Sequence, residues 1–557
     1  MGTTVFTARN IITMNPEQPF ARAVAVKDGR IIAIGEPDQV QFWLEGSPFT
    51  PVDVDTTFQD KILMPGIVDA HTHVELQALI YTGHFVAQIP WPRPEGGFYP
   101  VYPDKTDVLQ RLKDIDKELP PGEPLYAVAY DENKAGGFLH IDELDRVSEQ
   151  RPILVSNLVF HRFWVNRALL KKAGIAEDAL PPGVEADESG KPTGTLVEAT
   201  GLMAVLSALP DLVNITEEKL RYILPLFRKG GYTTVCDAAV GALGFKKSLD
   251  TFRGFLSDSG RLSDGGTGLR VVALPWAKTG VVEAGSRDNF IEWVIREGQK
   301  NTESFRIGPV KLYTDGSIIS HTSPVGWPGY WDGSPEGHME NDPAEIREML
   351  IRCHAAGLST VTHANSRLGC QVVIDAVKAA QAKAYRPDMR HRIDHAYNIT
   401  AAQLRQAKAL GVTLQFFTPQ IYYYGDAHLK IQGPDRARHI TPTGTAKRLG
   451  VSWGFHNDPP GTPQLPWIGA WSTVHRITLG SETILGPEQR VTVEDVLQAM
   501  TIEAAYQLHL DHEIGSIEFG KKADFCVLEA DPLEIDPMDL KEIPVWGTVW
   551  SGRPYPA

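Results

Sequence analysis

The sequence has little cysteine, no long hydrophobic run and no excess of basic charge. Its 557 residues contain four cysteines, and none of them forms a Cys-x-x-Cys pair, so disulfides cannot staple the chain and a reducing cytoplasm is favoured. No apolar run approaches the roughly 20 residues of a membrane-spanning helix, and the polar start Met1-Gly-Thr-Thr has no signal-peptide core. With 54 basic against 69 acidic side chains the net charge is −15, which argues against a nucleic-acid partner. We therefore expect a globular cytoplasmic protein that binds neither nucleic acid nor membrane.

The composition predicts a large folded core. Apolar residues make up 42% of the chain and charged residues only 22%, which excludes general disorder. The length suits three or four average domains, although one α/β barrel can take up about 250 residues or more.

Both ends of the chain are predicted to be β-rich. Residues 24–34 form two β-prone runs around Asp28-Gly29, which is a common hairpin turn, and residues 525–528 and 545–550 are further strand candidates. The two ends, residues 1–60 and 505–557, are expected to pair into one small domain.

The middle of the chain predicts alternating helices and buried parallel strands. Four times a helical stretch ends at a glycine and an apolar strand follows, at Gly231, Gly357, Gly411 and Gly450. Residues 62–69 fit as the first strand, and 269–274 and 309–313 as two others. This pattern predicts a (β/α)8 barrel over residues 61–504. Residues 80–215 depart from this pattern and are interpreted as an insertion after the first strand. This position is at the active-site end of the barrel, where the insertion would act as a lid.

Residues with metal-binding chemistry stand at the ends of these predicted strands. Asp69, His71 and His73 share one face of an extended chain, where two imidazoles can chelate a divalent ion and the carboxylate can support them. At this histidine content, roughly 0.5 His-x-His pairs are expected by chance, so the motif alone is weak evidence. The position of His71 and His73 directly after an apolar run is what favours a metal site. His363, His395 and Asp458 close three later strands, and such a mixed set suits zinc, manganese or iron. His391 and His395 also have helical i, i+4 spacing, but no His-Glu-x-x-His is present.

Lys311 lies inside an apolar predicted strand, where an unpaired ammonium would be costly. It can extend to solvent, pair with Asp315, or react with carbon dioxide to give a carbamate that bridges two ions.

Taken together, several motifs in order resemble the amidohydrolase superfamily, and within it the YtcJ/AepA-like branch that includes N-substituted formamide deformylases. The resemblance covers nearly the whole chain and rests on Leu63-Met-Pro-Gly-Ile-Val-Asp-Ala-His-Thr-His73, Phe163-Trp-Val-Asn166, Pro192-Thr-Gly-Thr-Leu-Val-Glu198, Val310-Lys-Leu-Tyr-Thr-Asp-Gly-Ser317, Thr362-His-Ala-Asn365, Arg390-His-Arg-Ile-Asp-His395 and Phe519-Gly-Lys-Lys-Ala-Asp524. It implies a metal-dependent (β/α)8 TIM barrel joined to a small β-sandwich made from both termini.

The resemblance also implies the site. The metal ligands would be His71, His73, Lys311, His363, His395 and Asp458, with one or two divalent ions, zinc by preference, and N6-carboxylysine at position 311. Glu198 is a rival for the bridging carboxylate. The chain departs from the family pattern at four places: Arg-Ile-Asp394-His replaces Arg-Ile-Glu-His, His456-Asn-Asp458 replaces Gly-Ser-Asp, Val159-Phe-His161 replaces Asp-Gly-His, and Asn365-Ser-Arg367 stands where Gly-Asp is common.

The implied reaction is metal-assisted hydrolysis of a non-peptide carbon–nitrogen bond in a small amide or formamide, in which the ion lowers the pKa of bound water to near neutrality. Asp458 would carry the proton from water to the departing amine, and His395 and His161 would stabilise the oxyanion. Aromatic loop residues favour a hydrophobic or aromatic substrate: Trp91, Trp164, Trp327, Tyr330, Trp331, Phe416, Phe417 and Tyr422–Tyr424. Cyclic amides, carbamates, esters, lactones and deamination stay open as alternatives, as does a non-catalytic binding protein. By analogy, a homodimer is expected.

Overall fold

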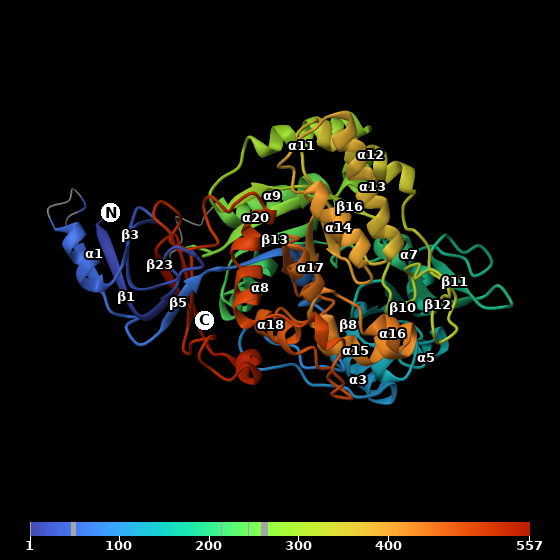
Figure 1. Cartoon of the computed structure of the whole chain (residues 1–557). Helices are drawn as coiled ribbons and strands as arrows, with labels where there is room; N and C mark the ends of the chain where they lie inside the picture. The colour runs from blue at the N-terminus through green and yellow to red at the C-terminus, as the bar shows by residue number, and fades with distance from the viewer. Residues whose placement is uncertain (1, 46–48, 50–51, 213, 243, 258–265) are drawn as a thin grey trace.

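Strands from both ends of the chain form one mixed eight-stranded sheet, drawn in blue and red at the left of Figure 1. The computed structural model describes residues 2–45, 49, 52–212, 214–242, 244–257 and 266–557. The strand order is β23-β22-β21-β5-β1-β2-β3, with β4 on β1. The bounds are β1 (Thr3–Ile12), β2 (Phe20–Lys27), β3 (Arg30–Gly35), β4 (Val52–Asp55), β5 (Ile62–Pro65), β21 (Phe525–Leu528), β22 (Val545–Trp550) and β23 (Arg553–Pro556); α1 (Pro37–Leu44) follows β3.

This sheet confirms that the two ends of the chain pair. The hairpin β2–β3 turns at Asp28 and Gly29, whose φ angles of 51° and 75° are those of a left-handed two-residue turn. β5 pairs antiparallel with β21 and joins the C-terminal strands to the N-terminal ones. The ladders describe one sheet, so the division into a two-layered sandwich stays a prediction.

The predicted first strand is in fact two strands that belong to different sheets. β5 ends at Pro65 in the terminal sheet, and β6 (Ile67–Thr72) begins two residues later in a parallel sheet. Gly66 stands at the change of sheet, and a Cβ atom there would lie 2.1 Å from Thr233 Oγ1. The continuous apolar run hid the break, because both strands are buried along their whole length.

Nine strands of the middle region form two parallel sheets. β6 pairs with β13 (Tyr232–Val240), then β14 (Arg270–Pro275) and β15 (Phe305–Ile307). The second sheet is β16 (Val310–Tyr313), β17 (Thr360–Ala364), β18 (Arg392–His395), β19 (Thr413–Phe416) and β20 (Trp453–Phe455). Trp276, just after β14, bridges to Lys311 in β16, and at the other side β20 contacts β6. The α/β class and the parallel strands are thus confirmed.

Helices alternate with these strands and cover them (Figure 1). The predicted glycine stops are confirmed: Gly231, Gly411 and Gly450 cap helices in the left-handed conformation. Gly357 has a left-handed φ of 81° and follows a helix whose cap, Ala356, is right-handed. The helices are α2 (Val74–Ile80), α8 (Glu217–Gly230), α9 (Phe245–Ser257), α10 (Ala277–Ala284), α11 (Arg287–Gly298), α12 (Pro343–Ala355), α13 (Arg367–Lys383), α14 (Ala401–Leu410), α15 (Pro419–Gln432), α16 (Pro434–Ala437), α17 (Thr443–Leu449), α18 (Pro466–His475), α19 (Val493–Ala499) and α20 (Ile502–Gln507).

Residues 84–197 build a separate six-stranded sheet, in the order β11-β12-β10-β9-β8-β7. It lies within the segment that the sequence marks as an insertion. Its elements are β7 (His84–Phe85), α3 (Lys105–Glu118), β8 (Leu125–Tyr130), α4 (Glu132–Ala135), α5 (Ile141–Asp145), β9 (Ile153–Asn157), β10 (Arg162–Val165), α6 (Arg167–Lys172), β11 (Val184–Ala186) and β12 (Pro192–Val197), followed by α7 (Glu198–Leu206).

A buried acid at the start of α4, Glu132, predicts a pH-dependent stability. Burial and the neighbouring Asp131 raise the pKa of Glu132 to about 7. The folded chain therefore holds a proton that the unfolded chain loses near pH 4.5, so between these values stability falls as pH rises, by up to about 1.4 kcal/mol per pH unit. Glu132→Gln removes this pH dependence. In thermal unfolding, the stability of the variant relative to the wild type should therefore rise between pH 5 and pH 8. The same stability difference between variant and wild type at pH 5 and at pH 8 would contradict this prediction.

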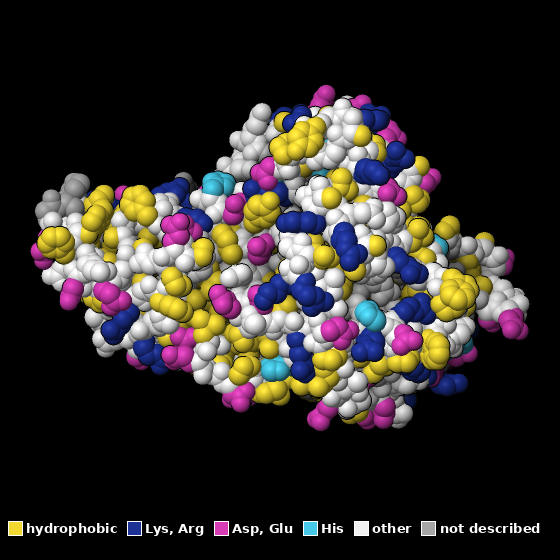
Figure 2. Space-filling view, in the orientation of Figure 1, with side chains coloured by type: hydrophobic (Ala, Val, Ile, Leu, Met, Phe, Trp, Pro, Cys, Tyr) yellow, Lys and Arg dark blue, Asp and Glu magenta, His cyan; other side chains and the backbone are white. Residues whose placement is uncertain are grey.

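The surface does not gather one sign of charge on the face drawn in Figure 2, where acidic and basic side chains are interspersed. All four cysteines are free and buried. Among the described residues, no helix combines the length and apolarity that crossing a membrane requires.

Candidate metal centre

The predicted site residues meet at the carboxyl ends of the parallel strands. His71 lies in β6 and His73 directly follows it, His363 lies in β17, His395 ends β18, and Asp458 follows β20. Parallel register brings residues from neighbouring strands level, as in the pairing of Ala364 with His395. The carboxyl edge of such sheets is where catalytic side chains collect.

Three imidazoles converge on the Asp458 carboxylate. His71 Nε2 lies 3.1 Å and His73 Nε2 3.3 Å from Asp458 Oδ1, and His395 Nδ1 lies 3.5 Å from Oδ2. Burial alone would raise the pKa of this carboxyl, but the charges of His71 and His395 hold it well below its ordinary value. Asp458 is therefore ionised at neutral pH, as a ligand or a proton acceptor must be.

His71 is oriented from behind by Asp394. Its Nδ1 lies 2.5 Å from Asp394 Oδ2, so Nδ1 donates to the carboxylate and Nε2 faces Asp458. Arg392 Nε donates to Asp394 Oδ1 at 2.7 Å. Burial would raise the pKa of Asp394, yet Arg392, His71 and Lys311 hold it well below its ordinary value. A carboxylate behind the far nitrogen is the usual way to fix a metal-binding histidine.

Lys311 reaches the same carboxylate. It is 3% exposed, and its Nζ lies 3.4 Å from Asp394 Oδ2. Burial lowers the pKa of its ammonium, against the opposing charge of Asp394. The lysine thus has a partner, but the partner is Asp394 rather than Asp315, which instead accepts hydrogen bonds from the backbone nitrogens of residues 365 and 366. Its carboxylation stays a prediction.

Replacing Asp394 tests this arrangement. Asp394→Asn should lower metal affinity about 10–100-fold, because the hydrogen bond that fixes His71 is weakened. It should also cost about 3–5 kcal/mol of stability, since Arg392 and Lys311 keep buried charges. Chelator competition and chemical unfolding measure the two effects. Asp388→Asn is the matched control, because Asp388 is an exposed partner of Arg390 outside the site. Unchanged affinity with lowered stability would show that Asp394 has only a structural role.

Unpartnered nitrogens mark this cluster as fitted for a cation. His395 Nε2 and both ring nitrogens of His456 are buried and have no hydrogen-bond partner. One ligand atom from each of four groups lies within 4.8 Å of the others, and the groups are His71, His395, His456 and Asp458. A divalent ion would satisfy one nitrogen of each imidazole, and it would replace the proton that a contact between a histidine and a carboxylate otherwise needs. The donor set present therefore fits a metal.

His363 lies beside this cluster without joining the group of four. Its ring is 4.3 Å from that of His395 and stacks on Tyr313 at 4.0 Å. Its Nε2 lies 3.0 Å from Asn365 Nδ2 and 3.4 Å from Gly316 O, so this nitrogen already has protein partners.

His161 and Glu198 reach the site from the insertion. His161 Nδ1 lies 2.9 Å from both Glu198 oxygens, and the His161 ring is 6.1 Å from His363. Burial would lower the pKa of His161, but Glu198 raises it above its ordinary value. The Glu198 carboxylate thus favours the protonated form of His161.

The backbone is strained at several of these positions. Glu198, His395, Ala396 and Asp458 have φ angles of 57°, 70°, 48° and 51°, in the left-handed region that non-glycine residues rarely enter. Such strain clusters at functional sites, where the surrounding structure enforces it.

Two contacts refine the sequence-based interpretation. Asp69 Oδ1 accepts from the backbone nitrogen of His71 at 3.1 Å and Oδ2 from Gln464 at 2.8 Å, so Asp69 supports the backbone and not an imidazole ring. Trp164 is fully buried against Tyr130 in the insertion core, with ring centroids 5.1 Å apart, and is not a loop residue.

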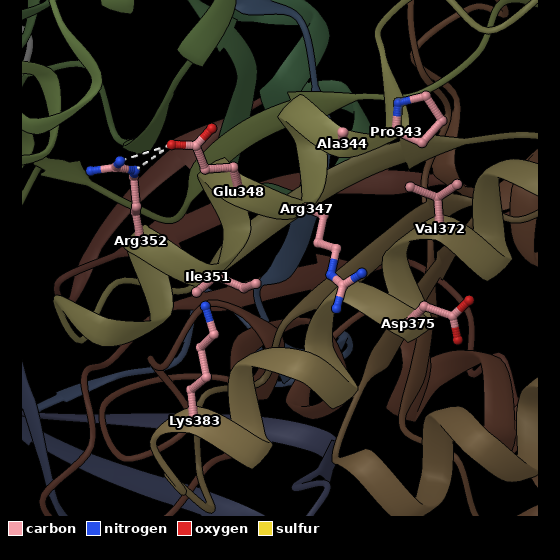
Figure 3. A pocket seen from close by; sticks show the side chains of 9 residues that line it. All are labelled: Pro343, Ala344, Arg347, Glu348, Ile351, Arg352, Val372, Asp375 and Lys383. Carbon is pink, nitrogen blue, oxygen red and sulfur yellow. Dashed lines mark hydrogen bonds and ion pairs between the residues drawn. The ribbon is translucent and has the colours of Figure 1, made fainter.

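A separate hollow of about 760 Å³ lies on the surface between α12 and α13 (Figure 3). Charged side chains line much of it, and Glu348 pairs with Arg352 across one end. None of its nine lining residues belongs to the histidine cluster.

Comparisons with known proteins show which family the chain resembles. The model of the "Amidohydrolase family" matches residues 59–555. N-substituted formamide deformylase of Arthrobacter pascens is 24% identical over 98% of this chain and 96% of its own, and the putative amidohydrolase YtcJ of Bacillus subtilis is 24% identical over 98% and 97%. A solved structure of an uncharacterized metal-dependent hydrolase from Pyrococcus horikoshii has a TM-score of 0.70 at 20% identity, covering 96% of this chain and 99% of that one.

The family match spans both parallel sheets, every residue of the histidine cluster and, in the terminal sheet, β5, β21, β22 and most of β23, whereas β1 to β4 precede it. Together with the relatives it confirms the resemblance to the YtcJ/AepA-like branch and identifies an enzyme that hydrolyses carbon–nitrogen bonds. The chain belongs to the amidohydrolase family.

Proposed function

We propose that the protein hydrolyses an amide or formamide bond of a small, hydrophobic or aromatic substrate, using a divalent ion, zinc by preference. The observation that carries this proposal is the convergence of His71, His73 and His395 on an ionised Asp458, beside buried imidazole nitrogens without partners. The similarity to a protein named N-substituted formamide deformylase supports the bond type.

The residues of the site have distinct tasks in this reaction. A divalent ion held by these residues would lower the pKa of water and polarise the substrate carbonyl. Asp458 accepts the proton of the attacking water and delivers it to the departing amine. His161, whose pKa Glu198 raises, stands where its protonated form can stabilise the anionic oxygen. His395 acts as a ligand rather than as an oxyanion donor, because its Nδ1 faces Asp458.

Aromatic rings beside the histidines support an apolar substrate. Phe417 stacks near His456 at 5.4 Å, Tyr313 stacks on His363, and the Tyr397 ring lies 6.3 Å from that of His395. Uncharged aromatic walls with few polar groups are typical of sites for small hydrophobic ligands.

The architecture that we propose around this site is the one expected from the sequence. In this proposal the two parallel sheets, which contact each other at both edges, together form a (β/α)8 barrel over residues 61–504. Residues 80–215 are its lid-like insertion. Residues 1–60 and 505–557 contribute the terminal β-domain, to which residues 62–65 are now added. Free buried cysteines support a cytoplasmic location, and the homodimer stays a prediction.

Metal analysis and a substrate panel test this function. The purified protein should hold a stoichiometric divalent ion and release amine from N-substituted formamides or other N-acyl amines, with loss of activity on chelation and recovery on adding zinc. Lactams, carbamates, lactones and aminated heterocycles belong in the same panel. Turnover confined to one of those classes would replace the proposed bond type. An ion-free protein without turnover would support the non-catalytic alternative.

A further inference from the structure

His456 occupies the centre of the histidine cluster, although neither its strand nor its spacing singled it out. It follows β20 directly and is 1% exposed. Its ring centroid lies 4.4 Å from that of His71 and 5.0 Å from that of His395, and Phe417 covers another side at 5.4 Å. The imidazole is therefore enclosed by two expected metal ligands and an aromatic ring.

Neither nitrogen of this imidazole has a hydrogen-bond partner. Leaving a buried polar group unsatisfied costs about 1–3 kcal/mol, and native proteins rarely accept it without a reason. Two buried histidines outside the cluster, His428 and His391, have partners on both ring nitrogens. His428 contacts Gln420 at 2.8 Å and Gln432 at 2.7 Å, and His391 contacts Thr360 and His354. The exception at His456 calls for a ligand that the protein itself does not supply.

The chain around His456 aims it and Asp458 at the same point. Between them, the Asn457 side chain donates to the carbonyls of Pro463 and Leu465 at 3.0 and 2.9 Å. This anchor directs residue 457 away from the cluster, while positions 456 and 458 face it. Asp458 holds its left-handed φ of 51° next to this anchor.

We propose that His456 is itself a ligand of the ion, which is then held by His71, His395, His456 and Asp458. The inference rests on the proposed function, because it assumes that the cluster binds a divalent metal. Three neutral imidazoles and one carboxylate suit zinc and other first-row divalent ions. In this set Lys311 is not a ligand. Its ammonium instead balances Asp394, 3.4 Å away, and so keeps His71 in position.

Metal binding by variants tests the assignment without reference to turnover. Apo-protein of the wild type, His456→Asn and His428→Asn is titrated with zinc against a chelator, and cobalt(II) is added to record its visible spectrum. His428 is the matched control, since it is equally buried but fully hydrogen-bonded. We expect one ion per wild-type chain. The zinc affinity should be at least about 100-fold weaker in His456→Asn, which exceeds the ~10–100-fold effect of losing a residue that only hydrogen-bonds to a ligand. His428→Asn should change the affinity little.

The cobalt spectrum should also change shape in His456→Asn, because an imidazole leaves the coordination sphere. X-ray absorption of the wild-type zinc protein gives a second measurement that needs no variant, and it should show three imidazoles. An unchanged spectrum and affinity in His456→Asn, with the wild type still binding one ion, would overturn the inference and leave the proposed function standing. Two ions per chain with a lysine carbamate signal after 13C-bicarbonate labelling would also overturn it. A wild type that binds no ion would reject both.

Discussion

Asp458→Asn is expected to lower kcat/KM by about 10²–10⁴-fold, the range that a positioned proton carrier contributes. The wild-type carboxylate faces three imidazoles and is ionised at neutral pH, so it can accept a proton at the start of each cycle. An amide of the same shape has no basic oxygen and cannot return a proton to the amine. The loss should therefore appear mainly in kcat, measured with whichever amide the panel identifies.

Two readouts separate the proton-carrying role of Asp458 from its metal-binding role. If the asparagine variant keeps its ion at saturating zinc but remains slow, proton transfer is the missing step. If saturating zinc restores wild-type turnover, Asp458 serves only as a ligand and the proposed mechanism is wrong. Asp332→Asn is a suitable control, because Asp332 pairs with a histidine, His321, outside the cluster.

His71→Asn is expected to have the largest effect on metal content, with the variant isolated without a stoichiometric ion and without measurable turnover. His71 contacts Asp394 on one side and Asp458 on the other, and it is 1% exposed. Its removal deletes a ligand and also leaves the buried Asp394 with one partner fewer. The loss of affinity should therefore exceed the ~10–100-fold expected for an outer carboxylate.

A comparison with His73→Asn makes this prediction sharper. The His73 side chain is 20% exposed and contacts Asp458 at 3.3 Å, so its loss should weaken the ion less than the loss of His71. Inductively coupled plasma mass spectrometry of each variant, alongside the surface control His338→Asn, measures the order. Equal metal content in wild type and His71→Asn would mean that the ion, if present, lies elsewhere.

The sequence predicted the parts of the fold that local chemistry determines. Glycine stops at Gly231, Gly411 and Gly450 and the Asp28-Gly29 turn need only neighbouring residues to be recognised, and all were confirmed. The change of sheet at Gly66 was missed, because its cause is the approach of Thr233, far along the chain.

The same distinction applies to the site. His71, His73, His395 and Asp458 were predicted and lie together, whereas Asp394 was noted only as a departure from the family pattern. Its contact with His71 joins positions 323 residues apart, which no local pattern reveals. His456 stands two residues before Asp458, but the φ of 51° at Asp458 is not that of an extended strand, so the spacing alone did not predict that both residues face the cluster.

The junction at Gly66 couples the last strands of the chain to the start of β6, the parallel strand whose far end carries His71 and leads to His73. Gly66 donates its backbone N–H to Asp524 O at 2.9 Å, and β5 lies between β1 and β21. A truncation that removes the residues after 524 would remove β21, the antiparallel partner of β5. It would thereby destabilise the segment that leads into β6 and positions His71 and His73. The C-terminal strands are thus needed to keep the geometry of the metal site. Proteolytic removal of residues 525–557 should therefore abolish activity although it removes none of the proposed ligands.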